Sequence, residues 1–178
     1  MKKIEIIVMG KTGTGKSTLI NAVLEEDLAP TGKGQPVTRK NEVYSKKMLL
    51  PVGANDNGRY GCVACMVNMY DTVGLEIDNA ITDRTLNEIK THIEKTKART
   101  DPLDIHVVWF CMNERCNKFE DYELELIRKL SIDYEIPFIL VLTQCFSGRE
   151  GELEKQIKNA VPEVPIRCIL AKDYRVRG

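Results

Sequence analysis

A chain of 178 residues, 43% of them hydrophobic, can bury one sizeable core, so we expect a single domain over residues 1–178. Lysine plus arginine balance aspartate plus glutamate at 26 each, and this zero net charge gives no support for a nucleic-acid partner or a charged membrane surface. No apolar run approaches the ~20 residues that a membrane-spanning helix needs, and the six cysteines are typical of reduced thiols in a cytoplasmic protein.

Hydrophobic periodicity predicts strands and helices in alternation along the chain. Ile4–Met9 is an apolar run interrupted by Glu5, which predicts a strand buried on both faces of a parallel sheet. Glu42–Pro51 and Gly61–Asp71 predict a hairpin, because residues that tolerate positive φ separate them. The later predictions are helices over 83–99, 119–130 and 153–160 and strands over 104–112, 136–143 and 165–170. His106 is expected to be an ordinary core residue. This order predicts a three-layer α/β/α sandwich with a six-stranded, mostly parallel sheet and one antiparallel edge strand.

A recognisable chemical motif follows the first predicted strand: Gly10-Lys11-Thr12-Gly13-Thr14-Gly15-Lys16-Ser17-Thr18. It is G-x-x-x-x-G-K-[ST] in the strand, turn and helix context that a P-loop requires. Its glycines let successive backbone N–H groups turn toward an anion, and the helix that follows adds its positive end. Lys16 would reach the β- and γ-phosphates, and the Ser17 hydroxyl would hold Mg²⁺. We therefore expect these nucleotide-binding residues: Lys11, Thr12, Gly13, Thr14, Gly15, Lys16, Ser17 and Thr18. The alternative is an ordinary Gly-rich turn.

Two further segments carry a resemblance to a known family. Asp71-Thr72-Val73-Gly74 ends the second hairpin strand, and Pro36-Val37-Thr38-Arg39 precedes the first. With the P-loop, they resemble the TRAFAC class of P-loop GTPases, in particular its septin-like and Era-like branches, over essentially the whole chain. The resemblance implies a P-loop NTPase fold, GTP and GDP as ligands, and Mg²⁺ held by Ser17, Thr38 and Asp71. It also gives catalytic roles at the γ-phosphate to Lys16, Thr38 and Gly74, with Thr31 as the alternative to Thr38.

The segments that would read the base depart from this family. Thr143-Gln144-Cys145-Phe146 stands where the family has N/T-K-x-D, so Phe146 replaces the aspartate that grips guanine. Losing a charge-assisted pair of this kind costs about 1.5–3 kcal/mol of binding free energy. The preference for guanine is therefore expected to weaken, while the phosphate contacts still bind the nucleotide. Ile169-Leu170-Ala171-Lys172 resembles the family's S-A-K segment and favours guanine. We expect Thr143, Gln144, Ala171 and Lys172 to lie at the base of GTP, with ATP as the alternative.

The resemblance further implies a molecular switch with slow GTP hydrolysis. Leu75 stands where Ras-like members place the water-orienting glutamine, and several members with a hydrophobic residue there are activated by nucleotide-dependent dimerisation. A homodimer in which Arg39 or Lys11 acts across the interface is one arrangement that follows. The alternatives are a nucleotide-gated interaction module with negligible catalysis and an ATP-binding P-loop ATPase or kinase. No helical pattern follows the last predicted strand, which favours truncation before a terminal helix and any C-terminal region.

Overall fold

The structure is a computed structural model, which describes residues 2–31, 42–53, 61–72, 105–116, 120–133, 135–146 and 150–171. Its strands are β1 (Lys2–Met9), β2 (Glu42–Val52), β3 (Gly61–Asp71), β4 (Ile105–Asn113), β5 (Phe138–Thr143) and β6 (Ile166–Cys168). Its helices are α1 (Lys16–Leu24), α3 (Asp121–Arg128) and α4 (Glu152–Ala160), with a π-helical turn, η1 (Lys129–Asp133), directly after α3. The helix predicted over 83–99 lies outside the described residues.

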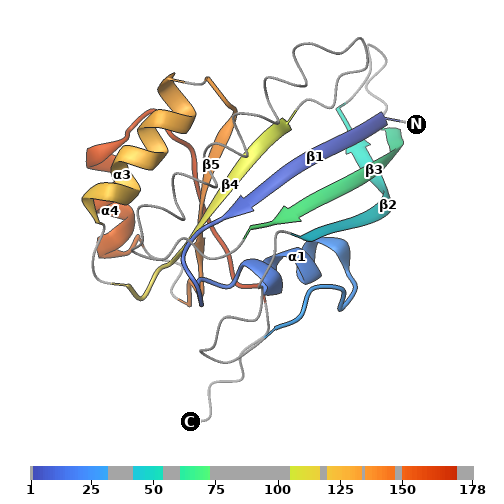
Figure 1. Cartoon of the computed structure of the whole chain (residues 1–178), viewed down its shortest axis with the longest axis horizontal. Helices are drawn as coiled ribbons and strands as arrows, with labels where there is room; N and C mark the ends of the chain where they lie inside the picture. Colours follow the sequence, from blue (N-terminus) through green and yellow to red (C-terminus); the bar gives the residue numbers. More distant parts are fainter. Residues whose placement is uncertain are drawn as a thin grey trace.

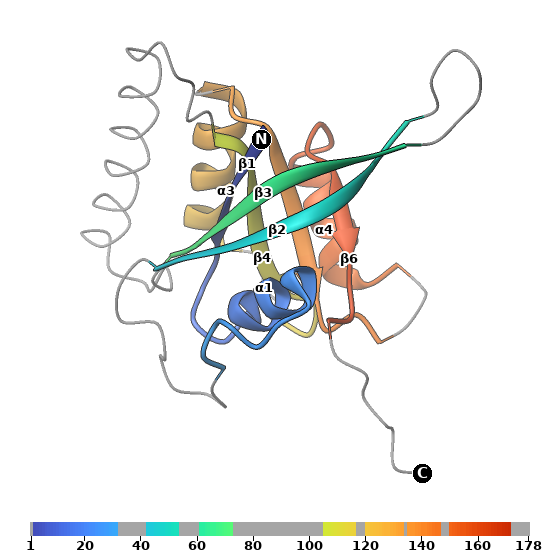
Figure 2. The ribbon, with the colours of Figure 1, turned by 90° about the vertical axis from the view of Figure 1, so that its right-hand side faces the viewer.

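The six strands form one sheet in the order β2-β3-β1-β4-β5-β6. β2 pairs antiparallel with β3, and every other neighbouring pair is parallel. β2 and β3 form the long twisted ribbon that crosses the front of the sheet in Figure 2. The predicted fold class, a mostly parallel six-stranded sheet with one antiparallel edge, is therefore confirmed.

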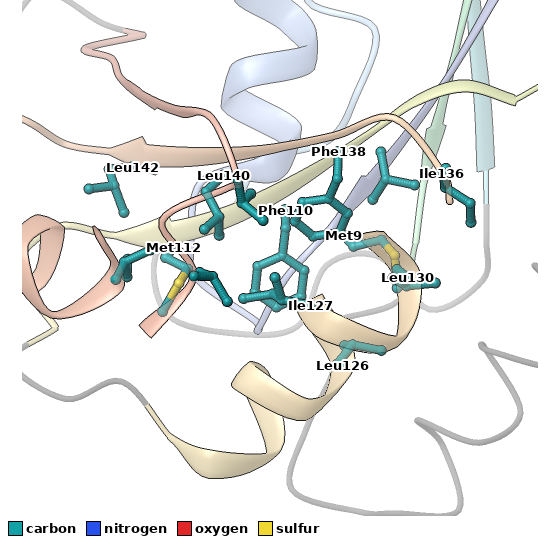
Figure 3. Close-up of a cluster of buried hydrophobic side chains, with 14 of the residues drawn as sticks. Met9, Phe110, Met112, Leu126, Ile127, Leu130, Ile136, Phe138, Leu140 and Leu142 are labelled. Atoms are coloured by element: carbon teal, nitrogen blue, oxygen red, sulfur yellow. The ribbon is translucent and has the colours of Figure 1, made fainter. Parts of the chain in front are cut away.

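Helices cover the two faces of the sheet: α1 lies on one face, and α3 and α4 lie on the other (Figure 1). Because successive residues of a strand point to opposite faces, β1 contributes Ile6 and Val8 to the cluster under α1. Its Ile7 and Met9 join the larger cluster under α3 and α4, which Figure 3 shows around Phe110. The prediction that β1 is buried on both faces is correct.

Two side chains differ from what the sequence led us to expect. Glu5, which interrupts the apolar run of β1, is fully buried and accepts hydrogen bonds from Asn68 Nδ2 and Tyr70 Oη at 2.8 Å each. His106 was expected in the core, but its side chain is exposed, and Nδ1 accepts the backbone N–H of Glu5 at 3.1 Å. The reason is position: His106 lies at the start of β4, before the strand enters the core that Val108 and Phe110 occupy.

The parallel strands place their carboxyl ends at one edge of the sheet, where ligands bind in sheets of this kind. The loop after β1, the end of β3 at Asp71, and Thr143 at the end of β5 all reach this edge. Among the described residues, no helix is both long and apolar enough to cross a membrane.

Candidate functional site

The loop between β1 and α1 has a backbone that requires glycine at three positions. Gly10, Gly13 and Gly15 have φ values of +138°, +79° and +89°, which side chains with a Cβ rarely adopt. At Gly10 there is no room either, since a Cβ would lie 2.2 Å from the carbonyl oxygen of Cys111 in β4. Gly15 is the N-cap residue of α1, so the loop passes directly into the positive end of that helix.

The ammonium group of Lys16 lies folded over this loop. Nζ donates to the carbonyl oxygen of Gly10 at 2.9 Å and to that of Lys11 at 3.0 Å. Burial lowers the pKa of Lys16 below its ordinary value of 10.5, and the nearby carboxylate of Asp71 works in the opposite direction. Among the described residues, the hydrogen-bond acceptors of this buried cation are two neutral carbonyls, and such a cation favours an anion as its next partner.

Two of the three residues predicted to hold a metal, Ser17 and Asp71, lie in contact, and the third, Thr38, lies outside the described residues. Ser17 Oγ donates to Asp71 Oδ2 at 3.0 Å, although 54 positions separate them in the chain. Asp71 is fully buried at the end of β3, and Ser17 lies in the first turn of α1. A hydroxyl and a carboxylate are hard oxygen ligands of the kind that Mg²⁺ takes alongside phosphate oxygens and water. The donor set therefore fits Mg²⁺.

Thr143, at the end of β5, connects the phosphate loop to that strand. Its Oγ1 lies 2.6 Å from the carbonyl oxygen of Thr14, to which it donates, and 3.2 Å from that of Met112. Beyond Thr143 the chain bends at Gln144, which has a φ of +59°. The backbone N–H of Cys145 then donates to the carbonyl oxygen of Ile169 at 3.2 Å, so the segment after β5 lies beside the one that leads to Ala171.

Phe146, at the position of the family's guanine-binding aspartate, packs against a cation. The guanidinium carbon of Arg115 lies 4.3 Å from the centre of the Phe146 ring, and the phenyl side chain keeps 38% of its surface exposed. Arg115 belongs to the turn that follows β4, a segment to which the sequence analysis assigned no role. An aromatic ring and a guanidinium can stack on any nucleobase, whereas a carboxylate would select guanine.

Lys11 points away from the loop toward the first turn of α3. Its Nζ lies 3.3 Å from Glu123 Oε1, 3.4 Å from Glu120 Oε1 and 5.1 Å from the centre of the Tyr122 ring. Burial alone would lower the pKa of Lys11, but the neighbouring Tyr122 side chain and the charge of Glu123 outweigh burial and raise that pKa. These partners of Lys11 were not predicted from the sequence. The Glu120-x-x-Glu123 spacing could have predicted a capping box at the start of a helix, but it does not indicate that Lys11 lies beside that turn.

The structure thus gathers the predicted residues of the loop, Asp71, Thr143, Gln144 and Ala171 at one edge of the sheet. The predictions for Thr38, Gly74 and Lys172 fall outside the described residues, as do those for Leu75 and Arg39. Thr31, the alternative to Thr38, is the last described residue of its segment and is exposed.

This fold and this loop define a P-loop NTPase domain of the small G-domain type. Residues 5–144 match the family described as "50S ribosome-binding GTPase", and since this is most of the chain, the protein belongs to that family. It is therefore a member of a GTP-binding GTPase family, of the TRAFAC class that the motifs predicted.

A curated relative and two solved structures agree with this class. The "Probable GTP-binding protein EngB" of Kosmotoga olearia is 28% identical over 156 residues, which cover 88% of this chain and 70% of that protein. Aquifex aeolicus Era, solved with GDP and AlF₄⁻, is similar with a TM-score of 0.63 and 20% identity, over 96% of this chain and 52% of that one. The septin GTPase domain of Chlamydomonas reinhardtii has a TM-score of 0.59 and 19% identity, over 99% of this chain and 66% of that one. At these identities the two structures support the fold alone, and the chain spans only about half the length of Era.

Proposed function

We propose that the protein is a Mg²⁺-dependent GTP-binding switch that hydrolyses GTP slowly. The observation that carries this proposal is the Ser17–Asp71 hydrogen bond of 3.0 Å beside the Lys16 ammonium. It places a hydroxyl and a carboxylate next to a cation, and together these are the groups that bind a nucleotide's metal-bound phosphates.

The described residues have distinct tasks in this proposal. The N–H groups of residues 11–18 and the Lys16 ammonium bind the phosphates, and Ser17 and Asp71 hold the metal ion. The bound ion neutralises charge on the β- and γ-phosphates. Thr143, Gln144 and Ala171 lie at the base, and Thr143 also fixes the loop through Thr14. Thr38, Gly74 and Lys172 complete the set as predictions from the sequence.

The first experiment measures nucleotide binding by calorimetry with Mg²⁺ present. Lys16→Ala should remove or strongly weaken binding, because a charge-assisted contact is worth about 1.5–3 kcal/mol, about 10- to 150-fold in affinity. Lys158→Ala is the matched control, since Lys158 is an exposed lysine of α4 with partners at Glu150 and Glu154. Unchanged binding in Lys16→Ala would overturn the proposal.

The preference for GTP over ATP is tested separately, at Phe146. Because Phe146 and Arg115 offer stacking rather than a carboxylate, GTP should outcompete ATP for the site only modestly. Phe146→Asp should increase the preference for GTP over ATP about tenfold, by restoring a charged acceptor for the guanine edge. Equal or better competition by ATP in the natural protein would retire guanine as the ligand.

A second candidate, a nucleotide-gated interaction module with negligible catalysis, follows from Leu75 in place of a water-orienting glutamine. Turnover measured over a range of protein concentrations separates the two candidates. A rate that rises with self-association supports a GTPase activated by a homodimer, whereas no turnover at any concentration supports the binding module.

A further inference from the structure

The backbone carbonyl of Lys11 is a centre of the hydrogen bonds within the phosphate loop. It accepts from Lys16 Nζ at 3.0 Å, from the backbone N–H of Thr14 at 3.3 Å and from Thr14 Oγ1 at 2.9 Å. A shift of this carbonyl would therefore move both the lysine that meets the phosphates and the middle of the loop.

The side chain of the same residue is held from outside the loop. Glu123, which contacts the ammonium at 3.3 Å, is only 3% exposed, so solvent screens this ion pair far less than it screens a surface pair. Glu120 adds a second carboxylate at 3.4 Å, and the ring of Tyr122 lies under the ammonium.

The first turn of α3, which provides these partners, is itself well ordered by a capping box. Glu123 Oε2 accepts the backbone N–H of Glu120 at 3.1 Å, and the Glu120 side chain accepts the backbone N–H of Glu123. Glu123 therefore caps the helix with one oxygen and binds Lys11 with the other.

We propose that Lys11 is a positioning residue, whose ammonium is held by the first turn of α3 so that its carbonyl fixes Lys16 in the phosphate loop. This inference rests on the proposed nucleotide function and goes beyond it, because it makes α3 part of the binding site. Lys11 then acts within its own chain, through its contacts with α3, and not across a dimer interface. Anything that moves the first turn of α3 changes nucleotide affinity.

The test is a double-mutant cycle read by GTP calorimetry and by thermal unfolding. Lys11→Met keeps the apolar stem and removes the charge, and it should weaken GTP about tenfold, given that misplacing a group by about 1 Å costs up to about 100-fold. Lys11→Arg should recover most of the loss, since a guanidinium can reach the same carboxylates. Lys11→Met combined with Glu123→Gln should bind no more weakly than Lys11→Met alone.

Lys158→Met is the matched control, because Lys158 also lies between two carboxylates, at 2.6 Å and 2.8 Å, but on α4 outside the loop. It should leave GTP affinity unchanged. Two results would overturn the positioning role. The first is a Lys11→Met variant that binds GTP as tightly as the natural protein and differs only in a lower unfolding temperature. The second is a double variant whose loss of GTP affinity equals the product of the losses from Lys11→Met and Glu123→Gln. Absence of nucleotide binding in the natural protein would instead overturn the proposed function, so the two failures are distinguishable.

Discussion

Replacing Thr143 by valine removes one buried hydroxyl and keeps the shape of the side chain. Thr143 is 3% exposed and donates to the Thr14 carbonyl at 2.6 Å, across 129 positions of the chain. Its side-chain atoms are also the nearest to a Cβ built on Gly15, at 3.6–3.7 Å, so the side chain packs against the loop as well as bonding to it. Valine preserves this packing, and the substitution isolates the hydrogen bond.

The expected cost follows from what the hydroxyl leaves behind. Thr14 is itself buried, at 5% exposure, so its carbonyl loses a protein partner where water has little access. An unsatisfied buried acceptor costs about 1–3 kcal/mol, and we expect Thr143→Val to lower the free energy of unfolding by that amount. Because the same carbonyl orients the phosphate loop, nucleotide affinity should also fall, by about tenfold for each 1.4 kcal/mol that appears in binding.

Urea unfolding and nucleotide calorimetry on the same preparations measure the two effects. Thr143→Ser, which keeps the hydroxyl and loses a methyl group, is the control and should retain most of the affinity. A loss of less than about 0.5 kcal/mol in both assays for Thr143→Val would refute the reasoning, since that is the lower limit for a net hydrogen bond.

Three further predictions follow from the same geometry. Gly10→Ala should lower the free energy of unfolding in urea by more than about 3 kcal/mol, since the added Cβ would lie 2.2 Å from the Cys111 carbonyl oxygen. Gly13→Ala is the control: no atom lies within 4 Å of its added Cβ, so it should cost only the positive-φ strain of about 1–2 kcal/mol. Burial and the hydrogen bond to Glu5 raise the pKa of Tyr70 to about 12. The stability that the protonated Tyr70 contributes is therefore complete below the ordinary pKa of 10.0 and is lost as pH rises through about 12. Tyr70→Phe should lack this alkaline loss when the free energy of unfolding is measured against pH. Cys111 is fully buried and its pKa is raised to about 12, so mass spectrometry should find its thiol unmodified by iodoacetamide in the native protein at pH 8, and rapid labelling there would contradict the described core.

Local sequence patterns were enough to predict the order of the described elements. Period-two and period-3.6 patterns depend only on neighbouring residues, and they located β1, the β2–β3 hairpin, β4, β5, α3 and α4 with small errors at their ends. The last strand is shorter than predicted, Ile166–Cys168 in place of residues 165–170, and η1 was not predicted. In η1, Ser131 Oγ donates to the Ile127 carbonyl at 2.7 Å, a bond that competes with the backbone hydrogen bonds of the helix.

Contacts between distant segments were the part that the sequence could not supply. Glu5 looked like an interruption of a strand, because its partners Asn68 and Tyr70 are more than 60 positions away. Lys11 was predicted to bind nucleotide or to act across a dimer interface, since nothing near it in the chain indicates that Glu120 and Glu123 come to lie beside it. Motif residues could be predicted because their spacing is local, whereas the groups that support them come from other elements.

These contacts support a loop that has three glycines at positive φ. Gly10 is confined by the Cys111 carbonyl of β4, Thr14 by Thr143 of β5, and Lys11 by the first turn of α3, so three separate elements hold one short segment. Backbone conformations of this kind persist where the surroundings over-determine them, and an anion-binding loop gains affinity when its N–H groups are already in place. Thr143→Val and Lys11→Met therefore act on one rigid unit, and their combined effect on nucleotide affinity should differ from the product of the single effects. Simple multiplication of the two losses, measured by calorimetry on the double variant, would show that the supports act independently.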